Sequence, residues 1–450
     1  MTAPDVPFEL TDRHLDVDSG ALTFSFGLGD DTFTETFTLA ERLDPVVDPA
    51  HPSIGHLLDV AHLCVGVSYY KLTLPGRIVA HRPLHPAISA LVPHLYDHGL
   101  RELAIRNDLA VPLEVSINAP AGSSAEPVDL FAAPGTTDAG PLVPFGGGKD
   151  STLTLSVLAD ADPVAFSIHP TPVQRRAAAA VGVPLLSMTR RLDPLLSVRT
   201  AEGGWNGHIP ITAINSSVSA IIAALLGRHD VVIANERSAE EPTMRVDDVP
   251  VNHQYSKTFR FENALADAIA PTGIRYWSSV RRWSELAIAG ALAHRGALRN
   301  AILSCNRAFS LTNPDPDPHW CRNCAKCRFT FVSFAPFLTP DEATEMFGGN
   351  LLDDPEQIEG VRALWSDKPF DCVGELAESA IAVDHLATRQ GWRDTVVVKA
   401  LRDDAARVAV ASGTDFDALL RPAGDDRVPP SFVDRIDGAL HAAAISTSET

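Results

Sequence analysis

Apolar and polar residues alternate along two neighbouring stretches near the N-terminus, residues 22–28 and 33–39, which a Gly-Asp-Asp turn joins. Alternation of this kind around a tight turn predicts a β-hairpin with one buried face. The spacing then changes, and residues 53–65 and 86–106 carry apolar side chains at helical intervals. We therefore expect residues 1–140 to form an α+β unit.

The pattern changes again after residue 140, where short apolar runs alternate with amphipathic stretches. Short apolar runs bounded by loops are typical of strands covered on both faces, and strand–helix alternation predicts a doubly wound parallel sheet. The predicted strands are residues 141–145, 163–168, 183–188 and 230–235, and the predicted helices are residues 152–158, 172–181 and 211–226.

The last part of the chain is helical in pattern, with Ala-rich stretches at residues 374–389 and 395–411. Residues 118–140 are rich in Ala, Pro, Gly, Ser and Asp, which is typical of a linker. We find no internal repeat. The predicted domains are an N-terminal α+β domain (1–140), an α/β domain with a doubly wound parallel sheet (141–340) and a helical C-terminal region (341–450).

The net charge of the chain limits the classes of function that it can have. The 450 residues include 37 basic and 57 acidic ones, a net charge of −20, which disfavours general nucleic-acid binding. No apolar run approaches the roughly 18 residues that a membrane helix needs. The N-terminus lacks the basic and apolar regions of a signal peptide. We expect a cytoplasmic protein that binds neither membranes nor nucleic acids. Six of the basic residues are lysines, so a lysine inside a motif is informative.

The sequence FGGGKDS at residues 145–151 follows the first predicted strand of the sheet and begins a helix. Glycines let the backbone turn tightly and direct its N–H groups at an anion, and the helix N-terminus adds partial positive charge. Asp150 is a candidate Mg²⁺ ligand. The alternative is a tight turn without a ligand. The candidate phosphate-binding residues are Gly146, Gly147, Gly148, Lys149, Asp150 and Ser151.

Two polar segments follow the fourth predicted strand. Asn235 ends this strand, and Glu236 and Arg237 come directly after it, where ligands of open α/β sheets bind. The sequence VNHQYSK at residues 251–257 contains His253 and Lys257, donors suited to carboxylate or phosphate groups. Each segment is alternatively an exposed polar loop.

Four cysteines have the spacing of a metal site. Cys321, Cys324 and Cys327 form CRNCAKC, and Cys305 precedes them. Four thiolates suit a tetrahedral Zn²⁺ with no open position, and therefore a structural role. An iron–sulfur cluster and a metal-free group of thiols are the alternatives. Cys64 and Cys372 remain outside this group.

The glycine-rich loop resembles the SGGxDS loop of the PP-loop ATP pyrophosphatases, with Gly146 in place of the usual Ser. That family splits ATP between the α and β phosphates and activates its substrate as an adenylate. The resemblance implies ATP and Mg²⁺ as cofactors and the fold of the adenine nucleotide α-hydrolases.

A finer resemblance rests on five segments: FGGGKDS, NERSA, VNHQYSK, CRNCAKC and KPFDCVGE. Together they resemble the UDP-N-acetyl-α-D-muramoyl-L-alanyl-L-glutamate epimerase family of bacterial peptidoglycan synthesis. This resemblance implies ATP-dependent inversion of the terminal L-Glu of a UDP-sugar dipeptide through a carboxyl adenylate, with release of AMP and pyrophosphate. Protein partners are not indicated. The catalytic candidates are Asp150, Lys149, His253, Lys257, Cys372 and Cys64.

Two thiols are included because cofactor-independent glutamate racemases use a pair of cysteines on opposite faces of the α-carbon. The competing function is that of a 7-cyano-7-deazaguanine synthase-like or amide-forming ligase, which also adenylates a carboxylate but captures it with ammonia. In that synthase the cysteines are closer together than Cys305 and Cys321 are here. An inactive nucleotide-binding scaffold and a tRNA-thiolating enzyme are further alternatives.

Overall fold

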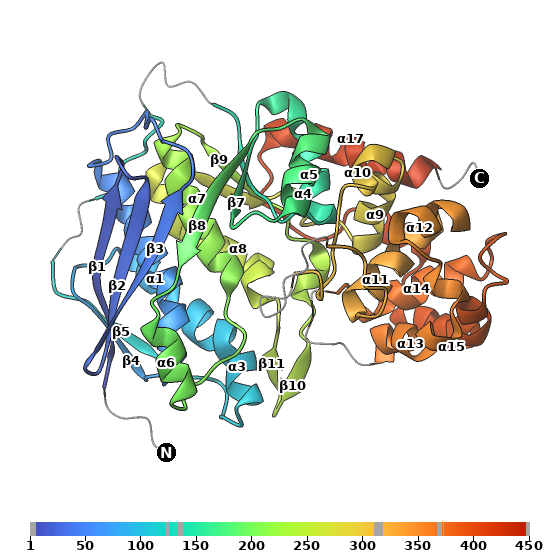
Figure 1. Cartoon of the computed structure of the whole chain (residues 1–450), viewed down its shortest axis with the longest axis horizontal. Helices are drawn as coiled ribbons and strands as arrows, with labels where there is room; N and C mark the ends of the chain where they lie inside the picture. Colours follow the sequence, from blue (N-terminus) through green and yellow to red (C-terminus); the bar gives the residue numbers. More distant parts are fainter. Residues whose placement is uncertain are drawn as a thin grey trace.

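The computed structural model describes residues 6–122, 126–132, 139–309, 318–366, 371 and 373–446, with side chains described to residue 441. Its centre is a ten-stranded sheet in the order β12-β9-β6-β7-β8-β3-β2-β1-β4-β5. Helices lie on both faces of one half of this sheet, and a group of helices at one end is built from the C-terminal residues (Figure 1). Within the described residues, no helix is both long and apolar enough to cross a membrane.

One half of the sheet is parallel and doubly wound. The chain runs outward from β6 through β7 to β8, then returns to β9 and β12 on the other side of β6. The direction of winding therefore changes between β6 and β9, where such sheets bind ligands. The strands are β6 (Leu142–Pro144), β7 (Val164–Ile168), β8 (Leu185–Arg191), β9 (Asp230–Ile233) and β12 (Arg275–Ser278).

Alternate strand residues enter two different cores. Val143 and Val232 pack with helices α4 (Lys149–Val157) and α5 (Pro172–Val181) on one face. Leu142 and Val231 pack on the other face with α1 (Pro52–Tyr70), α7 (Ile211–Leu225) and α8 (Phe259–Ile269). Burial on both faces explains the continuous apolar character of these strands.

The N-terminal strands extend this sheet instead of forming one of their own. Strand β3 pairs antiparallel with β8, with Leu39 opposite Met188 and Thr36 opposite Arg191. The purely parallel sheet expected from the sequence is thus corrected to a mixed one, because β8 offers a free backbone edge that β3 occupies. The added strands are β1 (Phe8–Asp16), β2 (Ala21–Leu28), β3 (Asp31–Leu39), β4 (Arg77–Ala80) and β5 (Ser116–Asn118).

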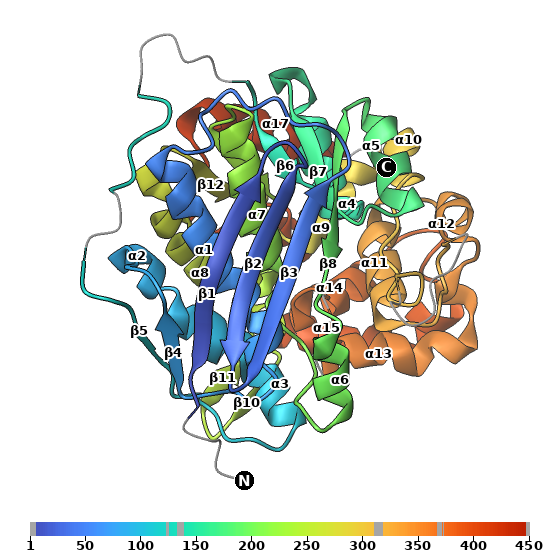
Figure 2. The ribbon, with the colours of Figure 1, turned by 60° about the vertical axis from the view of Figure 1, so that its left-hand side comes forward.

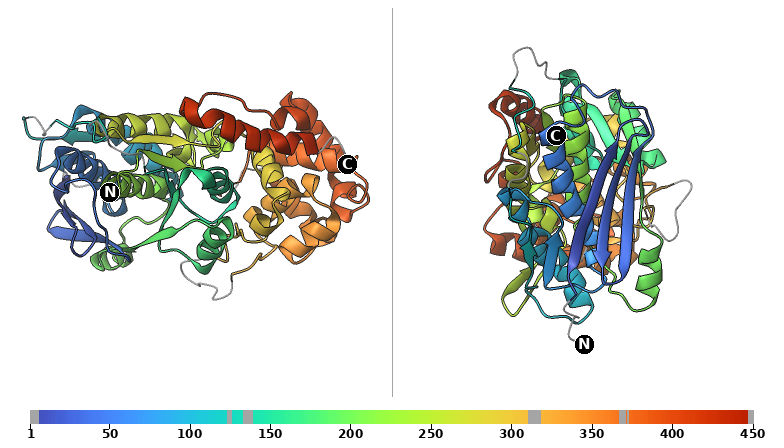
Figure 3. Two further views of the ribbon diagram at one scale, coloured as in Figure 1. Left: turned by 90° about the horizontal axis from the view of Figure 1, so that it is seen from above. Right: turned by 90° about the vertical axis from the view of Figure 1, so that its left-hand side faces the viewer.

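The predicted hairpin is confirmed as β2 and β3 (Figure 2). Its apolar side chains face α1, where Phe26 stacks on Tyr69 with ring centroids 5.2 Å apart. Exposed and half-buried polar residues alternate with them on the other face, over which no helix of the described residues lies (Figure 3, right). Alternation of apolar and polar residues along these strands therefore indicates a sheet with one solvated face.

One predicted helix is broken. The stretch at residues 86–106 forms α2 (Pro86–Ser89), a π-turn at Pro93–Asp97, a 3-10 turn and α3 (Arg101–Arg106). Pro93 has no N–H to donate, so the regular hydrogen bonds of an α-helix cannot continue through it, although Val92 before it keeps helical dihedral angles.

The helical C-terminal region is confirmed. Helix α17 (Pro430–Ser446) returns along the molecule and packs on α9 (Glu285–Ala293) (Figure 3, left). There Phe432 contacts Trp277 of β12 with ring centroids 5.1 Å apart, which joins this region to the sheet. The remaining helices are α6 (Leu195–Ala201), α10 (Gly296–Arg299), α11 (Ala325–Phe334), α12 (Pro340–Phe347), α13 (Ile358–Ser366), α14 (Leu376–Leu386), α15 (Val396–Ser412) and α16 (Phe416–Leu419), and β10 (Met244–Val246) and β11 (Val249–Val251) form a separate hairpin.

A buried ion pair lies where β3 and β8 join the two halves of the sheet, and its contribution to stability can be tested. Arg190 of β8 contacts Glu35 of β3 at 2.5 Å and donates to Ser68 at 2.9 Å. Because Glu35 is fully buried, Arg190→Ala is expected to leave an unpaired buried carboxylate and lower the free energy of unfolding by about 3–5 kcal/mol. The neighbouring Arg191 is exposed and serves as the control. Arg191→Ala should change the free energy of unfolding by less than about 0.5 kcal/mol. Equal urea midpoints for the two variants would contradict this role.

Candidate active site

A cavity of about 590 Å³ lies at the carboxyl ends of β6, β7 and β9, beside the point where the winding direction changes. Its walls come from the glycine-rich loop, the first half of α7, the residues after β9, and two segments near the cysteines. The lining includes Gly146, Gly148, Asp150, Ser151, Gln174, Thr212, Asn215, Ser216, Ser219, Asn235, Lys257, Ser304, Cys305, Asn306 and Lys326.

The glycine-rich loop has the geometry of an anion-binding turn. Gly147 has φ of +72°, and a Cβ there would lie 2.9 Å from Gln174 Cγ, so both conformation and space favour glycine. Gln174 braces the loop by donating to the carbonyl of Phe145 at 3.0 Å. Helix α4 begins behind it with Gly148 as N-cap and no capping side chain. The first-turn N–H groups are therefore suited to an anionic ligand.

Lys149 and Asp150 face different surroundings. Asp150 lines the cavity, whereas Lys149 is 2% exposed and forms ion pairs with Asp150 and Glu285. Burial would lower the pKa of Lys149, but Asp150 and Glu285 raise it well above its usual value. Burial raises the pKa of Glu285 to about 7. Lys149 thus holds the loop against α9, and its side chain is not part of the cavity wall.

Two other lysines reach the cavity from separate segments. Lys257 belongs to the 3-10 turn after β11, and Lys326 to the first turn of α11. Both act on Glu236, which is buried beside them. Burial would raise the pKa of Glu236, but Lys257, Lys149 and Lys326 together lower it to about 2. Two of the six lysines of a chain whose net charge is −20 thus lie in the wall of one cavity.

Asn235 is the member of its segment that lines the cavity. It is 5% exposed, and its Nδ2 has no hydrogen-bond partner among the described residues. A buried amide without a partner is costly, so a bound ligand is the natural acceptor. Arg237 instead contacts Glu375 at 3.2 Å and Glu378 at 3.8 Å.

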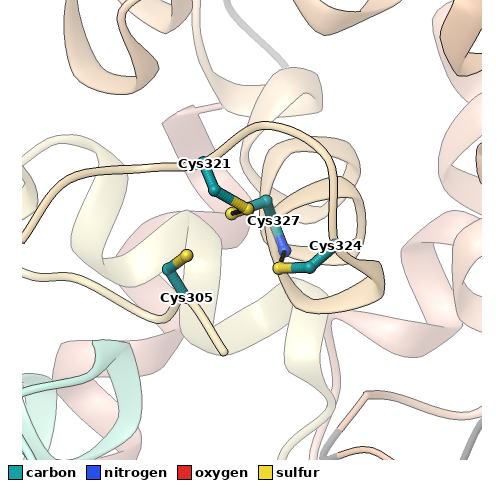
Figure 4. A group of neighbouring side chains, drawn as sticks. All are labelled: Cys305, Cys321, Cys324 and Cys327. Atoms are coloured by element: carbon teal, nitrogen blue, oxygen red, sulfur yellow. Dashed lines mark hydrogen bonds between the residues drawn. The ribbon is translucent and has the colours of Figure 1, made fainter. Parts of the chain in front are cut away.

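The four predicted metal-binding cysteines converge, and their Sγ atoms all lie within 4.8 Å of one another (Figure 4). The Sγ atoms of Cys321 and Cys327 are 3.8 Å apart. A tetrahedral ion with Zn–S bonds of about 2.3 Å places sulfur atoms about 3.8 Å apart. Cys324 caps α11 and accepts the N–H of Cys327 at 3.4 Å. The site fits one tetrahedral ion, whereas a four-iron cluster spreads its thiolates around several atoms.

The metal site and the cavity share a wall. Cys305 lines the cavity, and Lys326 does so from between Cys324 and Cys327. An ion held by the four thiolates would therefore fix the position of a cavity lysine as well as the fold of the loop.

Two of the remaining catalytic candidates, Cys64 and His253, are not among the residues that line the cavity. Cys64 is fully buried in α1, where burial raises the pKa of its thiol to about 12. His253 Nδ1 contacts Glu102 Oε2 at 2.6 Å, outside the cavity lining. Cys372 lies outside the described residues.

The sequence analysis missed several residues of the cavity wall. Polar groups three to four residues apart lie on α7, most of whose other residues are apolar: Thr212, Asn215, Ser216 and Ser219. A polar stripe on a buried helix was a usable signal. Lys326 could also have been recognised from the sequence, since it is one of few lysines and lies between two of the predicted metal-binding cysteines.

Comparisons with known proteins agree on one family. Residues 2–278 match the family model of the MurL N-terminal domain, and residues 301–415 match that of the MurL C-terminal domain. Three relatives are each named UDP-N-acetyl-alpha-D-muramoyl-L-alanyl-L-glutamate epimerase. That of Salinispora tropica is 38% identical over 97% of this chain and 96% of its own length. Those of a Micromonospora species and of Xanthomonas oryzae pv. oryzae are 39% and 36% identical, over 94% and 85% of this chain and 96% and 86% of their own lengths. No solved structure matches.

The four-cysteine site predicts the effect of removing one ligand. Cys324→Ser should lower the metal content of the purified protein and its melting temperature, because a structural ion contributes directly to the free energy of folding. Elemental analysis and thermal unfolding measure both effects. Cys64→Ser, which removes a thiol outside the cluster, should keep the metal. Full metal content in Cys324→Ser would contradict the assignment.

Proposed function

The chain belongs to the MurL family, and from this premise we propose that it is an ATP-dependent epimerase of peptidoglycan synthesis. Its substrate is UDP-N-acetylmuramoyl-L-alanyl-L-glutamate, whose terminal L-Glu it converts to D-Glu. The observation that carries this proposal is the cavity at the carboxyl ends of the strands, with a glycine-rich helix N-terminus and two scarce lysines in its wall. Such a cavity suits two polyanionic ligands, ATP and a UDP-sugar peptide.

We assign the nucleotide to the loop at residues 146–151, as in the PP-loop superfamily. The N–H groups of the first turn of α4 bind phosphate oxygens, and Ser151 adds a hydroxyl. Asp150 would hold Mg²⁺, a hard cation that prefers carboxylate and phosphate oxygens and offsets the phosphate charge. Lys257 and Lys326 neutralise phosphate or carboxylate groups from other parts of the cavity wall, and Asn235 donates its unpartnered amide.

Adenylation gives ATP a purpose in a reaction without a net bond change. Removing the α-proton beside a carboxylate would place a second negative charge next to the first. When the carboxylate oxygen attacks the α-phosphorus, pyrophosphate leaves and the carboxyl group becomes an uncharged mixed anhydride, which makes the α-carbon more acidic. A base removes the proton, an acid returns one to the opposite face, and water then cleaves the adenylate to AMP and carboxylate.

Among the described candidates for proton transfer, Lys257 lines the cavity, and we propose it for one of the two transfers. Cys372 stays a proposal for the other. A catalytic thiol needs a lowered pKa, and burial raises that of Cys64, so we give Cys64 a packing role. We propose Zn²⁺ for the four cysteines, where it positions Lys326.

The direct experiment incubates the protein with UDP-N-acetylmuramoyl-L-alanyl-L-glutamate, ATP and Mg²⁺, followed by hydrolysis and chiral analysis of the glutamate. We expect D-Glu to form with ATP and not without it. Formation of an amide when ammonia is added, with no D-Glu, would support the ligase instead.

Asp150→Asn tests the nucleotide site. Removing one carboxylate charge should lower substrate-dependent pyrophosphate release by roughly 100-fold or more, because the phosphate charge that develops is no longer offset by a held cation. The matched control is Asp403→Asn on the exposed surface of α15, which should release pyrophosphate at the wild-type rate. Normal release by a folded Asp150→Asn would remove Asp150 from the mechanism.

Lys326→Gln tests the lysine beside the metal site. Loss of a charge-assisted contact should weaken ATP or substrate binding by roughly 10-fold or more, measured calorimetrically, with metal content unchanged. The control is Lys399→Gln, whose side chain is 56% exposed and lies on α15. Wild-type dissociation constants for both ligands in Lys326→Gln would show that this cation does not contact either one.

A further inference from the structure

Three metal-ligating side chains meet at a second place, away from the four cysteines. Glu102 comes from α3, His208 from the segment before α7, and His253 from the segment after β11. One ligand atom from each lies within 4.8 Å of the other two. The two imidazole centroids are 4.2 Å apart, and His253 Nδ1 is 2.6 Å from Glu102 Oε2.

The surroundings of this cluster resemble the outer shell of a metal site. Glu102 is 5% exposed and has a second partner in Arg106, whose Nε contacts its carboxylate at 3.0 Å. The backbone of His253 forms a hydrogen bond with the ring of His208. Histidines that bind metals characteristically use their other ring nitrogen in this way, and ligating carboxylates are hydrogen-bonded in turn.

We propose that Glu102, His208 and His253 bind one divalent transition-metal ion, of which Zn²⁺ is the expected occupant. Two imidazoles and one carboxylate are a ligand set of zinc enzymes, and three protein ligands leave a position open for water or another ligand. Bonds of about 2.1 Å to a tetrahedral ion would hold the ligand atoms about 3.4 Å apart. That spacing lies between the 2.6 Å contact and the 4.8 Å limit of the cluster.

A metal-free proton relay is the competing explanation of the same cluster. A relay that acts on a ligand needs its last member at the cavity wall, and neither His208 nor His253 lines the cavity. Convergence of three ligand atoms from three separate segments is instead what a single ion requires.

Binding here would couple three segments close to the cavity. His208 lies four residues before Thr212, and His253 lies four residues before Lys257; Thr212 and Lys257 both line the cavity. The ion would therefore tie α3 to two segments of the cavity wall. This site is additional to the proposed epimerase function and does not depend on it.

Cobalt titration of the full-length, metal-stripped protein tests the site. Co²⁺ bound by thiolates gives an intense near-ultraviolet charge-transfer band, and Co²⁺ bound by nitrogen and oxygen ligands gives only visible bands. We expect two equivalents to bind wild-type protein, one of them without the thiolate band. His208→Asn and His253→Asn should each bind one equivalent fewer and retain the thiolate band.

His14→Asn, at an exposed position of β1, is the matched control and should bind two equivalents. A single equivalent in wild-type protein would overturn the proposal without reference to any variant. Two equivalents in folded His208→Asn and His253→Asn, verified by circular dichroism, would also overturn it. Activity is not read in this experiment, so failure of the metal site and failure of the epimerase proposal are distinguishable.

Discussion

One buried carboxylate, Glu236, brings together the parts of the cavity. Its charge is stabilised by Lys257, Lys149 and Lys326, which come from the turn after β11, the glycine-rich loop and the cysteine-bearing helix. Three of the six lysines thus act on a single group. Asp150 and Glu285, which form ion pairs with Lys149, add further negative charge, so that three cations from three segments can lie close together in a poorly solvated place. The net attraction places two of these cations in the wall of the cavity, where an anionic ligand can use them.

The rest of the fold keeps those segments in place. Lys149 links the loop to Glu285 of α9, and Cys324 caps the helix that carries Lys326. The N-terminal strands enlarge the sheet at β8, and α1 and α7 pack together beneath it. Polar residues on α7 then face the cavity from a helix that is otherwise core. The described residues that line the cavity all lie between Pro144 and Lys326, so the N-terminal strands and the C-terminal helices support the elements around the site and do not form its wall.

The local features of this fold were predictable from sequence. The loop at residues 146–151 was recognisable because strand, glycines and helix are adjacent in the chain, and the convergence of the four cysteines followed from their spacing. Pairing of β3 with β8 was not predictable, since edge pairing depends on strands about 150 residues apart. For the same reason, the convergence of Glu102, His208 and His253 could not be predicted from the sequence. The inward turn of Lys149 was hidden too, because its partner Glu285 lies 136 residues further along the chain.

The central claim is that this cavity activates a carboxylate by joining it to AMP, and oxygen labelling tests it most directly. If the glutamate α-carboxylate carries ¹⁸O in both oxygens, attack on the α-phosphorus and hydrolysis at the acyl carbon transfer one labelled oxygen to AMP. Mass spectrometry of the nucleotide product should then show AMP with a single ¹⁸O, formed together with D-Glu. Unlabelled AMP, or ADP as the product, would contradict the account.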